Sequence, residues 1–135
     1  MIRQLDERTL VSGQIAPHEV AGLVEQGVTV LVTNRPDGEE DGQPFASEIE
    51  EAAAQAGIAY HFVPIIRGIG PADVEEMQKA WREAEGGKLL AFCRSGNRSA
   101  FVCALAHRDE GASPDEVCQR LTAAGFDPSP IAHLL

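Results

Sequence analysis

The segment at residues 28–33 constrains the fold more than any other part of the chain. It reads Val-Thr-Val-Leu-Val-Thr, so every residue except Leu31 is β-branched, and it lacks the regular polar alternation of a strand with one wet face. Such a segment suits the middle of a parallel sheet, where helices cover both faces. It therefore predicts a buried parallel strand.

Helical and strand patterns alternate along the rest of the chain. We expect further strands at residues 58–63 and 89–92, and helices at 17–26, 45–56, 71–85, 99–109 and 113–124. This order implies right-handed crossovers and a mostly parallel α/β sheet of four to five strands flanked by helices. One domain spanning residues 1–135 is expected, with its ligand at the carboxyl ends of the strands.

Composition narrows the classes of function. The formal net charge of -10 argues against a nucleic-acid partner, because binding phosphate backbones needs clustered Lys and Arg. No apolar run suits a signal peptide or a membrane span, so we expect a cytoplasmic protein that does not bind membranes. The three cysteines and four histidines are scattered, and we expect no disulfide framework, no metal and no cofactor.

The segment Cys93-Arg94-Ser95-Gly96-Asn97-Arg98-Ser99 follows the predicted strand at 89–92 and leads into a helix. A strand that turns into a helix points several backbone N–H groups at one spot, and the helix dipole adds partial positive charge there. Gly96 allows the turn, and Arg98 can offer its planar fork to an oxyanion. We therefore expect Cys93 to be a thiolate nucleophile at neutral pH.

Residues near the predicted Cys93 loop have possible roles in the site. For some of them two roles are open. Ser99 can donate a hydrogen bond to the sulfur, and Arg94 either steers anions or is solvated. Arg35 and Arg67 either line the pocket or hold their own loops. Residues 94–97 are expected to bind the substrate through the loop, while residues 37–41 are expected to form a solvated acidic loop. Cys103 and Cys118 are expected to be packing residues.

The sequence resembles two known patterns. The string Cys-Arg-Ser-Gly-Asn-Arg matches the rhodanese active-site loop. The segments Ser12-Gly13-Gln14 and Asn34-Arg35-Pro36-Asp37-Gly38-Glu39, and the strand before Pro64, resemble the protein tyrosine and dual-specificity phosphatase fold. Together they are similar to the phosphatase-like domain family of beta-lactamase hydrolase-like proteins (DUF442), whose members are also described as sulfur transferases.

Departures from true phosphatases bear on the chemistry. Phe92 stands where their signature has His, and Arg98 lies five rather than six positions after Cys93. The loop at 64–70 carries Arg67 but no acid, and Asp73 is more simply a first-turn helix residue. Sulfur transfer needs no general acid, because a thiolate is already a good leaving group.

The sequence therefore favours a sulfurtransferase. Cys93 would take sulfane sulfur from thiosulfate or a low-molecular-weight persulfide and pass it to a thiol acceptor, with Arg98 holding the persulfide. The resemblance also implies a persulfide-oxidising enzyme as partner. The alternatives are a phosphatase that acts through a Cys93 phosphocysteine, and a non-catalytic thiol sensor or anion-binding module.

Overall fold

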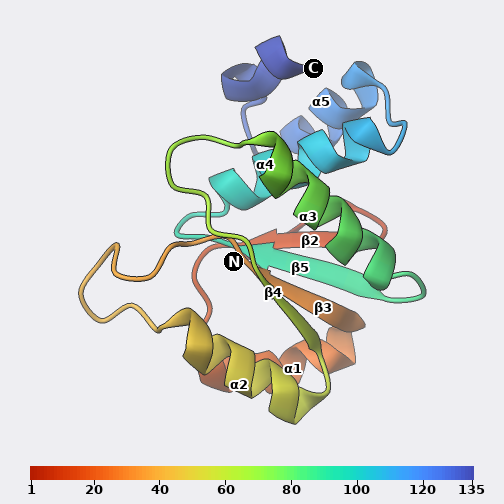
Figure 1. The fold of residues 1–135 in the computed structure, drawn as a ribbon. Coiled ribbons are helices and arrows are strands. Elements are labelled where there is room, and N and C mark those ends of the chain that lie inside the picture. The colour runs from red at the N-terminus through yellow and green to blue at the C-terminus, as the bar shows by residue number, and fades with distance from the viewer.

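A computed structural model describes residues 1–135, and a sheet of five strands forms its centre (Figure 1). The strands are β1 (Ile2–Asp6), β2 (Thr9–Ser12), β3 (Val28–Thr33), β4 (Ala59–Phe62) and β5 (Lys88–Phe92), in the order β1-β2-β5-β3-β4. Only β1 runs antiparallel to its neighbour. The prediction of a mostly parallel sheet of four to five strands is confirmed.

Helices cover both faces of the sheet (Figure 1). Helices α1 (Val20–Leu23) and α2 (Ala46–Ala56) lie on one face, and the other face carries α3 (Pro71–Glu83), α4 (Asn97–Asp109) and α5 (Pro114–Ala123). Each layer has its own apolar cluster, because Val30 and Val32 of β3 face α3 and α4 while Leu31 faces α1 and α2. This two-sided burial explains the run of apolar residues that predicted β3.

Four segments differ from the expectation. β2 was not among the expected strands. β1 was not expected, because it is an edge strand in which only Leu5 is buried and the apolar pattern is weak. The C-terminal 3-10 segment η3 (Ser129–Leu134) was also not expected. The first helix is confirmed, but it is a short α-helix between two 3-10 turns, η1 (Pro17–Glu19) and η2 (Val24–Gln26). No helix in the chain is both long and apolar enough to cross a membrane.

Asn34 ties together the carboxyl ends of three strands. Its backbone N–H donates to the carbonyl of Phe92 at 2.8 Å, and its side-chain amide donates to the carbonyl of Val63 at 2.9 Å. The Ser99 hydroxyl donates to its Oδ1 at 2.8 Å. Asn34 is fully buried, so water cannot replace these partners. The residue therefore fixes the end of β3 against β5, β4 and the start of α4.

We predict that Asn34→Ala lowers the free energy of unfolding by about 3 kcal/mol, because it leaves the buried Ser99 hydroxyl and Val63 carbonyl without their hydrogen-bond partner. Urea denaturation followed by circular dichroism measures the change. The matched control is Asn97→Ala, at an exposed position, for which a change within about 0.5 kcal/mol is expected. Equal effects of the two substitutions would contradict this role for Asn34.

Candidate active site

Cys93 is placed where β5 ends and α4 is about to begin. Its backbone N–H donates to the carbonyl of Ser12 at 3.2 Å, which holds the residue against β2. The N–H of Gly96 donates to Cys93 Sγ at 3.1 Å, and α4 begins at the next residue. Cys93 is buried, with 1% of its surface exposed. The sulfur thus lies at the amino end of a long helix, where an anion is stabilised.

Two glycines make the loop possible. Gly96 has φ of 100°, in the left-handed region that residues with a Cβ avoid. Gly13 lies behind the loop, and a Cβ there would come within 3.0 Å of the carbonyl oxygen of Arg94. That same carbonyl accepts a hydrogen bond from the N–H of Gln14 at 3.3 Å. The Ser12-Gly13-Gln14 segment therefore supports the Cys93 loop from β2.

Arg98 is held by a carboxylate from a distant loop. Its Nη1 and Nη2 donate to the two carboxylate oxygens of Glu39 at 2.8 and 2.9 Å, and Nη1 also donates to the carbonyl of Ile65 at 2.9 Å. Glu39 raises the pKa of Arg98, and the nearby Cys93 raises it further. In return, hydrogen bonding from Arg98 lowers the pKa of Glu39. The guanidinium is therefore oriented and always charged.

The other arginines of this region also meet the acidic loop. Arg35 is buried and donates to Glu39 and to Gln14, each at 3.0 Å. Arg94 is exposed and pairs with Glu40 at 3.1 Å. The contacts of Arg35 are those of a residue that holds its own loop, one of the two roles considered for it. In this arrangement Arg35 holds the acidic loop in place, and Arg94 lies at the exposed edge of the Cys93 loop.

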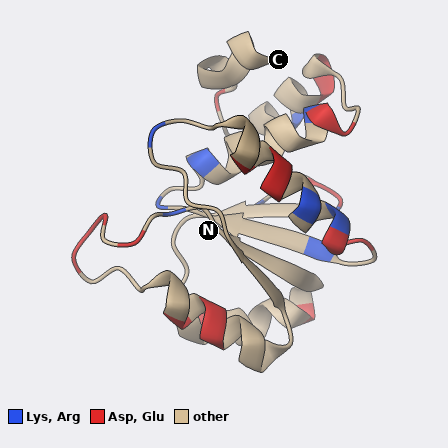
Figure 2. Ribbon diagram, in the orientation of Figure 1, with Lys and Arg blue, Asp and Glu red and all other residues tan.

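Residues 37–41 are exposed, as expected of a solvated acidic loop, and Glu39 and Glu40 in addition bind the arginines. Figure 2 shows the negative loop and the positive residues meeting at the carboxyl end of the sheet. Glu39 is the residue that sequence reasoning missed as a partner of Arg98. The only available signal was charge: three arginines at adjacent strand ends of an acidic chain need neighbouring carboxylates.

Further expectations can be compared with contacts and exposure. The Ser99 hydroxyl donates to Asn34, so the expected hydrogen bond to the Cys93 sulfur is absent. Asp73 Oδ2 accepts from the N–H of Gly70 at 2.8 Å, which confirms its role at the start of α3. Arg67 is exposed on the 64–70 loop. Ser95 and Asn97 are exposed on the loop, with the Asn97 N–H 3.4 Å from Ser95 Oγ.

The other cysteines are not equivalent to Cys93. Cys103 lies in the apolar cluster on α4, and burial raises the pKa of its thiol far above the ordinary value. It is a packing residue, as expected. Cys118 on α5 is partly buried. Among the three, only Cys93 receives a backbone N–H at the amino end of a helix, an arrangement suited to a thiolate that attacks an anionic group.

Comparisons with known proteins agree with this geometry. The family model described as "Beta-lactamase hydrolase-like protein, phosphatase-like domain" matches residues 1–109. A beta-lactamase hydrolase-like protein of Xylella fastidiosa is 38% identical over 128 residues, which are 93% of this chain and 30% of that protein. The chain thus spans less than a third of the curated relatives it matches.

Solved structures give the same fold. A candidate phosphatase from Neisseria meningitidis is 30% identical, with a TM-score of 0.78, and the match covers 98% of this chain and 94% of that one. TpbA of P. aeruginosa, solved as a cysteine-to-serine variant in complex with phosphotyrosine, is 16% identical with a TM-score of 0.68, covering 98% of this chain and 80% of that one. The fold is therefore that of the protein tyrosine phosphatases.

We predict that Glu39→Gln lowers the melting temperature at pH 7 by roughly 3 °C, because the charge-assisted bonds to Arg98 and Arg35 weaken. The folded pKa of Glu39 lies below its ordinary value of 4.5. Its carboxylate therefore stabilises the protein above that pH, and the advantage is lost as pH falls through the folded value. Thermal melts of both proteins from pH 3 to 8 test this; a difference that stays constant with pH would contradict it.

Proposed function

The chain belongs to the phosphatase-like domain family of beta-lactamase hydrolase-like proteins, and from that premise we propose that it hydrolyses phosphate monoesters through Cys93. The observation that carries the proposal is the hydrogen bond from the Gly96 N–H to Cys93 Sγ at the start of α4, beside the oriented guanidinium of Arg98. This arrangement joins a nucleophile to donors for a phosphoryl oxygen. The likeness to the Neisseria candidate phosphatase supports the same chemistry.

In the first step the Cys93 thiolate attacks phosphorus, so that an S–P bond forms as the P–O bond to the leaving group breaks. The leaving oxygen departs with the electron pair and takes a proton from water. Backbone N–H groups of the loop and the Arg98 guanidinium bind the non-bridging phosphoryl oxygens, whose charge they stabilise most strongly when the transition state is reached.

In the second step water attacks the phosphocysteine. An O–P bond forms, the S–P bond breaks, and the Cys93 thiolate is restored as inorganic phosphate leaves; the proton lost by water goes to solvent. Gly96 again stabilises the departing sulfur through its N–H. No external oxidant or reductant is needed.

The first step lacks a built-in acid for the leaving group. The loop at 64–70 contains no carboxylate, and Asp73 is engaged with the backbone of Gly70. Glu39 is near Arg98, but its lowered pKa keeps it ionised at neutral pH. Phosphate esters whose alcohols are themselves acidic, such as phenols, therefore suit this site better than alkyl phosphates.

Sulfur transfer through a Cys93 persulfide is the second candidate. Two observations favour it: the loop places Arg98 five positions after Cys93, and the 64–70 loop carries no carboxylic acid. A thiosulfate sulfur would then be attacked instead of phosphorus, with sulfite leaving, and a thiol would accept the sulfur. The comparisons favour the phosphatase over this alternative.

We predict that the protein hydrolyses p-nitrophenyl phosphate and that Cys93→Ser lowers kcat/KM by at least about 1,000-fold, because a serine hydroxyl in this loop has no base to activate it. Release of nitrophenol measures the rate. Cys118→Ser is the matched control and is expected to leave kcat/KM within about two-fold of the parent. Release of nitrophenol that persists in Cys93→Ser would overturn the proposal, as would sulfur transfer from thiosulfate with no phosphate release.

We also predict a steep dependence on the leaving group. Across a series of substituted phenyl phosphates, kcat/KM should fall by about ten-fold for each 1–2 units by which the phenol becomes less acidic, because no protein acid protonates the departing oxygen. Steady-state rates across the series give the slope. A flat dependence would mean that a side chain does supply the proton.

A further inference from the structure

An apolar hollow of about 410 Å³ opens beside the first turn of α4. Its walls come from the 64–70 loop, α4 and the C-terminal segment η3, which lie on one side of the sheet (Figure 1). The volume falls within the roughly 300–1,000 Å³ of small-molecule sites. The main apolar lining consists of Ile65, Ile69, Phe101, Ile131 and Leu134.

Arg98 joins this hollow to the Cys93 loop. Its side chain lines the hollow, while its Nη1 donates to the carbonyl of Ile65, another lining residue. Arg98 is also the second residue of α4, and the Cys93 sulfur lies at the amino end of that helix. A substrate with its anionic head on Arg98 therefore has the apolar hollow as the adjacent space for the rest of the molecule.

The polarity of the lining determines which kind of chemical group the hollow can bind. Besides Arg98, the only side chain with a polar group in the lining is His133. A sugar or a charged peptide would lose water from several polar groups without gaining partners there. An apolar group gains roughly 25 cal/mol for each Å² that it removes from water. Leu134 is 43% exposed, so a bound apolar group would cover surface that the free protein leaves wet.

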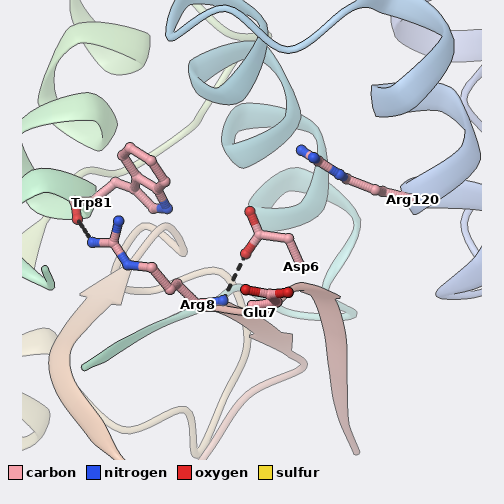
Figure 3. Close-up of a pocket in the computed structure, with 5 residues that line it drawn as sticks. All are labelled: Asp6, Glu7, Arg8, Trp81 and Arg120. Carbon is pink, nitrogen blue, oxygen red and sulfur yellow. Dashed lines mark hydrogen bonds between the residues drawn. The ribbon is translucent and has the colours of Figure 1, made fainter. Parts of the chain in front are cut away.

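A hollow at the opposite end of β5 has a different character. It has a volume of about 510 Å³ and is lined by Asp6, Glu7, Arg8, Trp81 and Arg120 (Figure 3). Arg8 stacks on Trp81 at 4.3 Å, and its carbonyl accepts from Leu89 near the beginning of β5, the end of that strand away from Cys93. Four of its five lining residues are charged and both signs are present, so it offers no apolar surface that continues from the Cys93 loop.

We propose that the hollow beside Arg98 binds the apolar part of the substrate, and that Phe101, Ile131 and Leu134 set its size and polarity. The inference rests on the proposed function and names its substrate class: phosphate monoesters of a compact apolar or aromatic alcohol, larger than a single phenyl ring. The C-terminal segment η3 is thereby part of the substrate site.

The test compares phenyl phosphate with 2-naphthyl phosphate, whose alcohols have similar acidity, so that the apolar area is the main difference. The parent protein should favour the naphthyl ester in kcat/KM by about ten-fold, as expected for the added apolar contact. Leu134→Gln, which keeps the volume but adds a polar group, should remove most of that preference. Val24→Gln is the matched control, since Val24 is 48% exposed and lies on η2, across the sheet.

Binding of the non-hydrolysable 2-naphthylphosphonate, measured by calorimetry, separates this inference from the proposed function. If binding weakens about ten-fold in Leu134→Gln but no ester is hydrolysed, the hollow is confirmed and the catalytic proposal fails. If the esters are hydrolysed but neither their ratio nor phosphonate binding responds to Leu134→Gln, the hollow is not the subsite. Absence of phosphonate binding to the parent protein would also overturn the inference.

Discussion

The site depends on the junction of a central strand and a helix, where one sulfur atom is held. Cys93 ends β5, and its sulfur accepts the Gly96 N–H immediately before α4. That position requires Gly96 to adopt a positive φ and Gly13 to leave room behind the loop. Asn34 secures the surrounding strand ends with buried hydrogen bonds. Backbone geometry thus supplies the donors before any substrate arrives.

Charge at this junction is organised by the acidic loop after β3. A chain with a formal net charge of -10 still concentrates Arg35, Arg94 and Arg98 at one edge of its sheet. Glu39 and Glu40 neutralise part of this charge and orient the guanidinium groups, and Arg98 remains next to Cys93. The same arginine borders an apolar hollow, so a positive charge at the start of α4 adjoins an apolar surface.

Much of this was predictable from the sequence, because its strongest signals are local. The β-branched run of β3 and the strand-turn-helix pattern at Cys93 are encoded by consecutive residues, and both were predicted. β1 was missed because an edge strand with one buried residue carries little pattern. The Arg98–Glu39 pair and the Ser99–Asn34 bond were missed because their partners lie 59 and 65 residues apart, a proximity that only the fold creates.

The central claim is that Cys93 receives the transferred group as a covalent intermediate. Rapid acid quenching of the protein during turnover of an aryl phosphate, followed by peptide mass spectrometry, examines this directly. The account predicts that the peptide containing Cys93 gains one phosphoryl group, and that this adduct disappears once the substrate is consumed. A Cys93 peptide that stays unmodified during turnover, or a phosphoryl group on any other residue, would contradict it.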